Sequence, residues 1–383
     1  MELPSYFEKF LREIRPTQPQ KDDLIQGHNA LRTRLSEHDE FKDLIVTTFL
    51  QGSYRRFTLV RPVGEELADV DVVVATNINT DEYTDPDKAM ELFVPFLREH
   101  YSGKYRRQGR SFGISLSYVT LDLVIASVPS LVAVEILKSE AVSCNDTLGE
   151  AMDWRLVPSW IPESQRHHPN GQAMVAKARE EQEWKADPIL IPDREVGKWI
   201  QTNPIEQMKW THAKNARCNG YYLGVVKALK WWQRVNPDVP GSPSGYPLEH
   251  IIGYCCPDWI SSVGEGIVGS LEGFVSSFRS NVLLHSVPEL PDHGVAGSNV
   301  LKRVTPSEFS ALFESIENAA VVARNAIDAD TVTKSADLWR QLFGEKFPPS
   351  GDNGDKGSDD PKGPFIIPNK GKPTGDTGPS KYA

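Results

Sequence analysis

Three aspartates in the first third of the chain have the residue type and spacing to bind metal ions. Asp69 and Asp71 are two positions apart, separated by Val70, at the start of an apolar, β-branched run. Residues two apart on a strand face the same side, so the two carboxylates would project together while alternate valines enter the core. Asp122 lies inside a second apolar run, residues 121–125. If these strands are neighbours, three carboxylates converge in a site suited to Mg²⁺ or Mn²⁺.

Such a cluster is consistent with phosphoryl transfer. Neighbouring carboxylates repel each other unless a cation lies between them. Two ions about 4 Å apart can activate an attacking hydroxyl and stabilise the leaving oxygen. Three other acids compete with Asp122 for the third position, but none lies in an apolar strand pattern. These are Glu135, Asp146 and Asp153.

A Gly-Ser pair precedes the acids at the end of another apolar run. In Gln51-Gly52-Ser53, glycine permits close approach of the backbone, and N–H groups with the serine hydroxyl can bind phosphate oxygens. Gly-Ser, then Asp-x-Asp, then a single Asp on a later strand is an order that resembles the polymerase-β-like nucleotidyltransferases. Neither short motif is specific alone; the combination favours this interpretation over scattered surface acids.

A second group of candidate residues lies on a helix expected over Gly220 to Val235. Lys227, Lys230 and Arg234 are three and four residues apart and share a face. A solvated basic stripe is the ordinary explanation, but a triphosphate needs cationic partners opposite the metal site, which favours Lys230 in particular. Tyr246 opens the next helix, where it could stack on a nucleobase or simply pack.

Other reactive residues are weaker candidates. His250, Cys255 and Cys256 lack paired zinc-ligand spacing and are expected in the core. The pair His167-His168 lies in a polar stretch and is expected to be solvated. Three arginines could contact phosphate or could equally mark a basic strand edge. They are Arg106, Arg107 and Arg110.

Composition limits the possible functions. The chain has 383 residues, 42 Lys plus Arg and 52 Asp plus Glu, for a net charge of −10. That charge argues against a protein that grips a long DNA or RNA template through its overall field, but not against small nucleotides bound through metal. A charged N-terminus, no apolar run long enough for a membrane and only four cysteines indicate a cytoplasmic protein with no membrane association.

The chain divides into three parts by pattern. Residues 1–202 mix helix and strand signals and carry the acids, with residues 138–202 expected as long loops and short helices. Residues 203–347 are helical, with start signals at Asn203-Pro204 and Thr305-Pro306. Residues 348–383 are rich in glycine and proline and are expected to form a flexible tail. We therefore expect an α/β nucleotidyltransferase core, a C-terminal helical domain, and a cleft between the two lobes.

The whole chain resembles the bacterial cGAS/DncV-like nucleotidyltransferases of CBASS anti-phage defence, in particular clade D. The segments that carry the resemblance are Thr48-Phe49-Leu50-Gln51-Gly52-Ser53, Asp69-Val70-Asp71-Val72-Val73, Gln108-Gly109-Arg110-Ser111-Phe112-Gly113-Ile114, Leu121-Asp122-Leu123-Val124-Ile125, Lys230-Trp231-Trp232 and Tyr246-Pro247-Leu248-Glu249-His250. The oligoadenylate synthetases share the last two in looser form.

This resemblance implies a synthase that makes an adenine-containing cyclic trinucleotide without a template. The product would be either of the AMP-AMP-AMP type, from ATP alone, or of the AMP-AMP-GMP type, from ATP and GTP. It implies that Asp69 and Asp71 hold two Mg²⁺ ions, that Asp122 completes the site, and that Ser53 and Lys230 contact phosphate. Tyr246 would stack a base, and Gln51, Gly52 and Lys227 are further expected nucleotide contacts.

The resemblance also implies partners. A downstream effector would respond to the cyclic nucleotide, and an E1/E2-like accessory protein could conjugate the C-terminal Ala383. We expect a monomer. Two alternatives remain open from the residues: a nucleotidyltransferase that adenylylates a small molecule, a protein or an RNA end, and a catalytically silent nucleotide sensor or scaffold. The clustered acids argue against the silent protein, because such a protein has no use for repelling carboxylates.

Overall fold

Seven strands form a mixed sheet in the computed structural model, which describes residues 1–128 and 188–351. The sheet order is β1-β2-β5-β4-β3, with β6 pairing both β5 and β7. The strands are β1 (Ile45–Gln51), β2 (Ala68–Thr76), β3 (Tyr105–Arg107), β4 (Phe112–Ser115), β5 (Val119–Ser127), β6 (Ile189–Asp193) and β7 (Lys198–Thr202). Among these strands, β2 and β5 run parallel, whereas the other named pairs are antiparallel.

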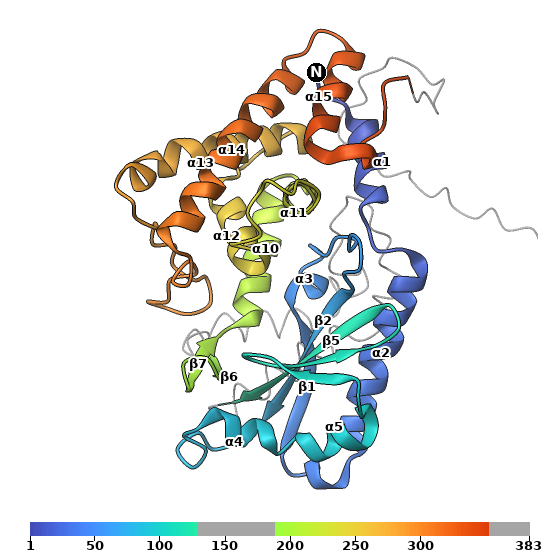
Figure 1. The fold of residues 1–383 in the computed structure, drawn as a ribbon, viewed down its shortest axis with the longest axis vertical. Coiled ribbons are helices and arrows are strands. Elements are labelled where there is room, and N and C mark those ends of the chain that lie inside the picture. Colours follow the sequence, from blue (N-terminus) through green and yellow to red (C-terminus); the bar gives the residue numbers. More distant parts are fainter. Residues whose placement is uncertain (129–187, 352–383) are drawn as a thin grey trace, which may run out of the picture. The chain divides into compact units, whose positions relative to one another are not determined.

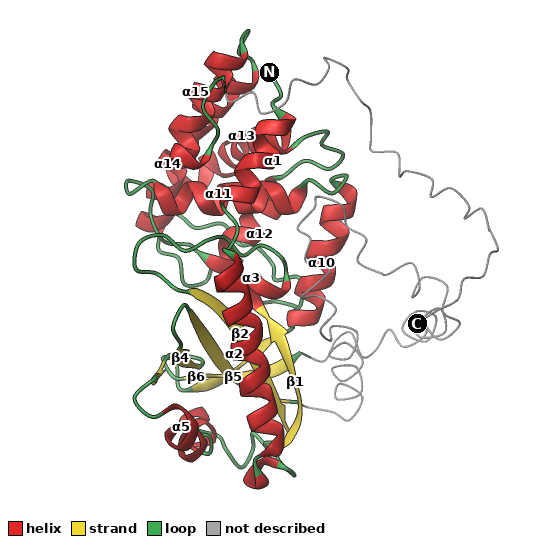
Figure 2. Cartoon of the chain, turned by 90° about the vertical axis from the view of Figure 1, so that its right-hand side faces the viewer, coloured by secondary structure: helices red, strands yellow, loops and turns green. Residues whose placement is uncertain are grey.

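Helices cover one face of this sheet. The helix α2 (Gln18–Glu37) lies along β2 and β5 (Figures 1 and 2), and α4 (Pro86–Glu91) and α5 (Val94–Tyr101) pack on the same apolar cluster. Val70 and Val72 belong to this cluster and are fully buried, as expected. The intervening residues of β2 face the other side, where Val73 and Val124 pack against residues of β6. Asp69 and Asp71 therefore lie on the face opposite α2.

The second half of the described chain is helical (Figure 2). It comprises α10 (Pro204–Arg217), α11 (Tyr222–Val235), α12 (Gly245–Cys255), α13 (Val263–Leu283), α14 (Pro306–Ile327) and α15 (Val332–Phe343). Both expected start signals are confirmed: Asn203 caps α10 by accepting from the Glu206 N–H, and Thr305 forms a capping box with Glu308.

The first helix differs from expectation. We expected residues 1–202 to form the core together with an N-terminal helix, but α1 (Pro4–Glu13) packs its aromatic face into the helical part. Phe7 meets Trp339 with ring centroids 5.1 Å apart, and Phe10 stacks on Phe343 at 4.6 Å. Burial of these rings stabilises the packing of α1, so the first helix is part of the hydrophobic core of the helical part.

Two further segments differ from their sequence patterns. The apolar residues from Pro86 to Tyr101 have the spacing of a single helix, but the helix is broken between α4 and α5, because Pro95 has no N–H to donate to the preceding turn. Residues 189–202 were expected as loop or short helix, but they form the hairpin of β6 and β7. The rest of that hard-to-assign segment, together with Glu135, Asp146, Asp153 and His167-His168, lies outside the described residues.

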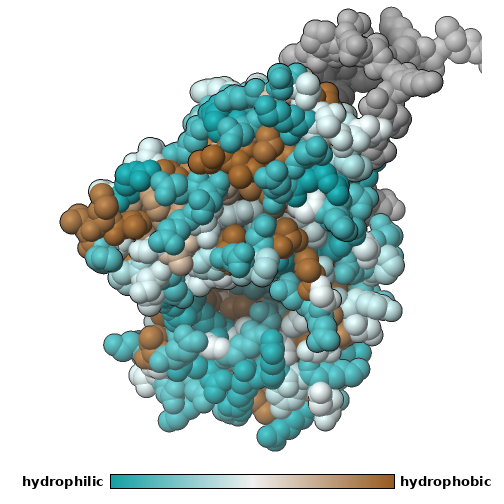
Figure 3. Space-filling view, turned by 45° about the horizontal axis from the view of Figure 1, so that its top comes forward, coloured by the Kyte–Doolittle hydropathy of each residue, from teal (hydrophilic) through white to brown (hydrophobic). Residues whose placement is uncertain are grey.

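The chain separates into two compact units, Met1–Ser350 and Gly351–Ala383. Nearly all of the second unit, which was expected as a flexible tail, lies outside the described residues. No described helix is long and apolar enough to cross a membrane. The face in Figure 3 is largely hydrophilic, with scattered apolar patches. Among the described residues, Trp259, Leu283 and Leu284 are the most exposed large apolar side chains.

Candidate active site

The three aspartates converge because β2 and β5 pair in parallel, residue for residue. Asp71 lies opposite Asp122 in the register, and Asp69 lies opposite Thr120. Asp69 is the second residue of β2, and Asp71 and Asp122 are the fourth residues of their strands. The carboxylates therefore gather in the first half of these two parallel strands, on the face away from α2. The condition that we set from sequence, that the two strands be neighbours, is met.

The electrostatics of the cluster show the cost of bringing these groups together. Burial, followed by the charges of Asp69 and Asp122, raises the pKa of Asp71 to about 7. Burial and the charge of Asp69 raise the pKa of Asp122 to about 6, against the opposing effects of Gln108 and Arg106. Bound cations would relieve this repulsion, and three carboxylates form the oxygen-rich donor set that Mg²⁺ requires. The residues therefore fit the expected metal site.

The Gly-Ser turn lies directly against these acids. Gln51 ends β1 opposite Asp71, and Gly52 begins α3 (Gly52–Arg55) with a φ of 73°. A Cβ atom on Gly52 would lie 1.7 Å from Asp71 Oδ2, so only glycine fits both the backbone conformation and the space. The turn is braced at its other end, where Thr58 N–H donates to the Ser53 carbonyl at 2.9 Å. The structure thus brings Gln51, Gly52 and Ser53 to the acids.

One buried carboxylate connects this turn to the helical part of the chain. Glu249 on α12 accepts hydrogen bonds from Arg56 Nε at 2.9 Å, Thr58 Oγ1 at 2.8 Å and Lys230 Nζ at 2.8 Å. Despite burial, the charges of Arg56 and Lys230 lower its pKa to about 2. The charge of Arg56 also opposes the rise in the pKa of Asp71 that burial and the neighbouring acids cause. Glu249 therefore fixes the end of the Gly-Ser turn relative to Lys230.

The basic residues of α11 do not form a solvated stripe. Lys230 is largely buried and pairs with Glu249, and its ammonium has two more N–H donors besides the one on that carboxylate. Lys227 is only 6% exposed, and burial with the charges of Arg15, Lys21 and Lys230 lowers its pKa to about 7.

Arg234 has a different surrounding. It donates to the carbonyls of Val60 and Arg61 and pairs with Glu66 at 3.1 Å. This arginine therefore ties α11 to the segment that follows the Gly-Ser turn, and its contacts are structural.

Tyr246 lies edge-on against a group of stacked rings. The Arg56 guanidinium carbon is 5.2 Å from the Tyr246 ring centroid, and Tyr246 Oη is 3.4 Å from His250 Nδ1. His250 stacks on His293 at 4.0 Å, and His293 stacks on Trp210 at 3.8 Å. Burial lowers the pKa of both histidines, that of His293 to about 3, so the rings are neutral at pH 7. These contacts hold Tyr246 in place; base stacking by it stays a prediction.

Several residues of this site were not singled out from sequence. Arg56 and Thr58 lie three and five residues after Ser53, and Glu249 lies in one of the segments that carry the family resemblance, but none of them was given a role. Gln108 is a fourth omission: its side-chain amide contacts Asp122. A local signal existed only for Glu249, as a charged residue in an otherwise apolar helix start.

Most of the other reactive residues have contacts that do not involve the acids. His250 and Cys256 are buried in the core, as expected, and Cys255 is partly buried beside them. Arg107 pairs with Asp87 and Glu91. Arg110 pairs with the buried Asp193, which accounts for it without phosphate.

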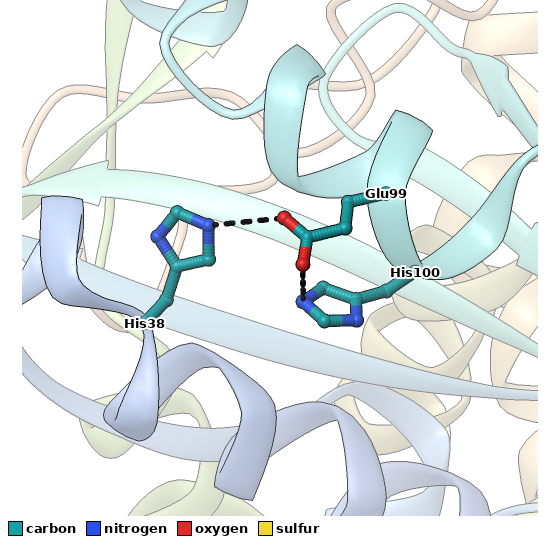
Figure 4. Close-up of side chains that lie close together, drawn as sticks. All are labelled: His38, Glu99 and His100. Carbon is teal, nitrogen blue, oxygen red and sulfur yellow. Dashed lines mark ion pairs between the residues drawn. The ribbon is translucent and has the colours of Figure 1, made fainter.

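A separate group of His38, Glu99 and His100 has ligand atoms within 4.8 Å of one another (Figure 4). Glu99 lies between the imidazoles, with one oxygen 3.8 Å from His38 Nε2 and the other 3.7 Å from His100 Nε2. Nδ1 of His38 is buried and has no hydrogen-bond partner in the described part of the chain, whereas a metal-ligating histidine normally donates its other N–H. Ion pairing accounts for this group, and we assign no metal to it.

Substitution of Gly52 tests the close approach to Asp71. We expect Gly52→Ala to lower the free energy of unfolding by about 1–3 kcal/mol more than Gly64→Ala, because it adds overpacking to backbone strain. Gly64 is the matched control: its φ of 64° is similar, but nothing lies within 4 Å of an added Cβ. Urea denaturation measures both. Equal losses would contradict the packing argument.

The raised pKa of Asp71 predicts a pH dependence of stability without divalent ions. The folded state keeps a proton on Asp71 that the unfolded state has released, so the free energy of unfolding should fall as pH rises from about 4 to 7. Thermal denaturation in EDTA should show a smaller fall for Asp71→Asn than for the wild type. Asp330→Asn, which changes an 80% exposed side chain, is the control and should follow the wild type. Parallel curves for all three proteins would refute this account.

Removal of the Glu249 carboxylate should be far more costly than removal of a surface carboxylate. Glu249→Ala leaves Arg56 and Lys230 buried without their counter-ion, so we expect a loss of about 3–5 kcal/mol. Glu317→Ala removes the exposed partner of Arg279 and should cost less than about 1 kcal/mol. Chemical denaturation compares the two, and similar values would show that Glu249 does not hold the turn.

Comparison with known proteins agrees with this geometry. The family described as "Second Messenger Oligonucleotide or Dinucleotide Synthetase domain" matches residues 1–130. A protein of Enterobacter hormaechei named cyclic AMP-AMP-GMP synthase is 44% identical over 97% of this chain and 97% of that protein. A cyclic AMP-AMP-AMP synthase of Acinetobacter is 29% identical over 91% of this chain and 87% of that protein.

Solved structures share the fold. The CD-NTase CdnG of Bradyrhizobium diazoefficiens, solved in complex with GTP, superposes with a TM-score of 0.60 at 10% identity, over 89% of this chain and 94% of that one. The 44% identity over nearly the full length establishes kinship beyond fold. The chain belongs to the cGAS/DncV-like nucleotidyltransferases, the family of the bacterial cyclic-nucleotide synthases.

Proposed function

We propose that this protein joins ATP and GTP into a cyclic trinucleotide of the AMP-AMP-GMP type. One observation carries the chemistry: Asp71 and Asp122 lie opposite each other on parallel strands, with Gly52 packed against Asp71. The names of the relatives at 44% identity favour a mixed product over the all-adenine one made by the more distant relative.

The site suggests a role for each group. Asp69, Asp71 and Asp122 would hold Mg²⁺, whose contribution when bound is to activate the attacking hydroxyl and to stabilise negative charge on the leaving oxygen. Gly52 and Ser53 would hold the donor phosphates through the start of α3 and the serine hydroxyl. Lys230, oriented by Glu249, would direct its other N–H donors to the same phosphates, and Tyr246 would stack the donor base.

Each round of the reaction makes one phosphodiester bond. A ribose hydroxyl oxygen of the acceptor attacks the donor α-phosphorus, the bond between that phosphorus and the bridging oxygen breaks, and pyrophosphate leaves with the electron pair. The hydroxyl proton passes to solvent. Repetition lengthens the chain, and attack by the terminal hydroxyl on the remaining 5′ triphosphate closes the ring. Because one site would catalyse every round, the acids must act on groups that all nucleotides share, whichever base is attached.

The surroundings of Lys227 reduce the support for its direct role. Its side chain is buried and its pKa is lowered to about 7, so we propose that Lys230, rather than Lys227, makes the phosphate contact from α11. Membership in clade D, an effector that responds to the product, and conjugation of Ala383 remain predictions, and Ala383 lies outside the described residues.

Labelled nucleotides test the proposal. Purified protein is incubated with ATP, GTP and Mg²⁺, treated with phosphatase and analysed by mass spectrometry. We expect a phosphatase-resistant cyclic AMP-AMP-GMP in the wild type and in the exposed-acid control Asp330→Asn, and none in Asp69→Asn/Asp71→Asn or Asp122→Asn. Linear or acceptor-linked AMP would identify a non-cyclising transferase instead. Nucleotide binding without pyrophosphate release would identify a silent sensor.

A further inference from the structure

The turn of residues 108–111 places a glutamine side chain next to the third acid. Gln108 Nε2 donates to Asp122 Oδ1 at 3.2 Å, and Ser111 Oγ donates to Gln108 Oε1 at 2.6 Å. Because an ionised carboxylate only accepts hydrogen bonds, the amide nitrogen must face Asp122 and the amide oxygen must face Ser111. Both ends of the Gln108 amide are therefore held.

The backbone of this turn is braced independently of the Gln108 side chain. The Arg194 N–H donates to the Gly109 carbonyl at 2.8 Å, and the Gln108 N–H donates to the Ser111 carbonyl at 2.9 Å. Arg110 Nε donates at 2.9 Å to Asp193, whose side chain is 1% exposed. The turn should thus keep its conformation when the side chain of Gln108 is changed.

A glycine on the neighbouring strand leaves room for the amide. Gly113 pairs with Asp122 in the register of β4 and β5. A Cβ atom on Gly113 would lie 2.4 Å from Gln108 Nε2, and its φ is not among the positive values of this chain. Space, rather than backbone conformation, therefore explains this glycine. The contact between Gln108 and Asp122 depends on a gap in the side-chain surface of β4.

From these contacts we propose that Gln108 is a positioning residue that fixes the carboxylate of Asp122 in the orientation needed to hold metal. By donating to Oδ1 it sets the plane of the carboxylate before nucleotide arrives and opposes the repulsion from Asp69. Outer-shell partners of metal ligands typically contribute a factor of 10–100 to metal affinity or activity. The proposal rests on the proposed function in assigning Asp122 to the metal site, but its test does not need turnover.

The role of Gln108 can be tested by measuring the affinity of the full-length protein for Mn²⁺. Electron paramagnetic resonance reports the binding, in the presence of a non-hydrolysable ATP analogue. We expect Gln108→Leu, which keeps the bulk of the side chain and removes the N–H donor, to weaken Mn²⁺ binding by about 10-fold or more. Ser111→Ala, which frees only the far end of the amide, should weaken binding less. Gln233→Leu is the matched control, because Gln233 also donates two hydrogen bonds, to the carbonyls of Pro240 and Pro243.

The outcomes separate this inference from the proposed function. Unchanged Mn²⁺ affinity in Gln108→Leu would overturn the positioning role, as would a loss of affinity matched by Gln233→Leu. Thermal denaturation of each variant shows whether a loss of affinity reflects loss of fold. If the wild type binds Mn²⁺ more tightly than Gln108→Leu but releases no pyrophosphate, the positioning role is supported and the proposed synthase fails.

Discussion

The arrangement of the site depends on the parallel pairing of β2 with β5. This pairing places Asp71 opposite Asp122 on one face, while Val70 and Val72 enter the core on the other. Repulsion between neighbouring carboxylates lowers the stability of the fold, so burial of the apolar face of the same strands must offset that loss. The same strands thus carry stabilising valines on the face that packs against α2 and repelling aspartates on the opposite face.

Groups outside the sheet compensate part of that repulsion from two directions. From one direction comes Arg56, whose guanidinium is held by Glu249 and therefore by the helical part of the chain. From the other comes the amide of Gln108, held by a turn that is anchored to Asp193. Asp193 is also paired with Arg303, which precedes α14. The site is therefore supported from distant segments of the chain on both flanks.

The three acids could be predicted from sequence because the two aspartates of Asp-x-Asp in a β-branched run face the same side of a strand. The α/β class, the Gly-Ser turn and the helix caps were likewise readable, since each depends on neighbours in the chain. The contact of Arg56 with Glu249 joins residues 193 positions apart, and no local pattern indicates it. The same limit explains why the burial of Lys227, which was expected as a nucleotide contact, was not predicted. It also explains why α1 was not assigned to the helical part, since its partner rings lie near the other end of the chain.

The register of β2 and β5 has a consequence for how the chain can vary. Because side chains alternate, a slip of one residue in either strand would carry its aspartate into the apolar core and a valine or leucine into the site. The exposed loop of residues 79–85, which follows β2, is under no such restriction, since extra residues there leave the pairing of β2, β4 and β5 unchanged. Insertions and deletions should therefore be tolerated in that loop but should disrupt the site when they fall within the paired strands, even when hydrophobic composition is preserved.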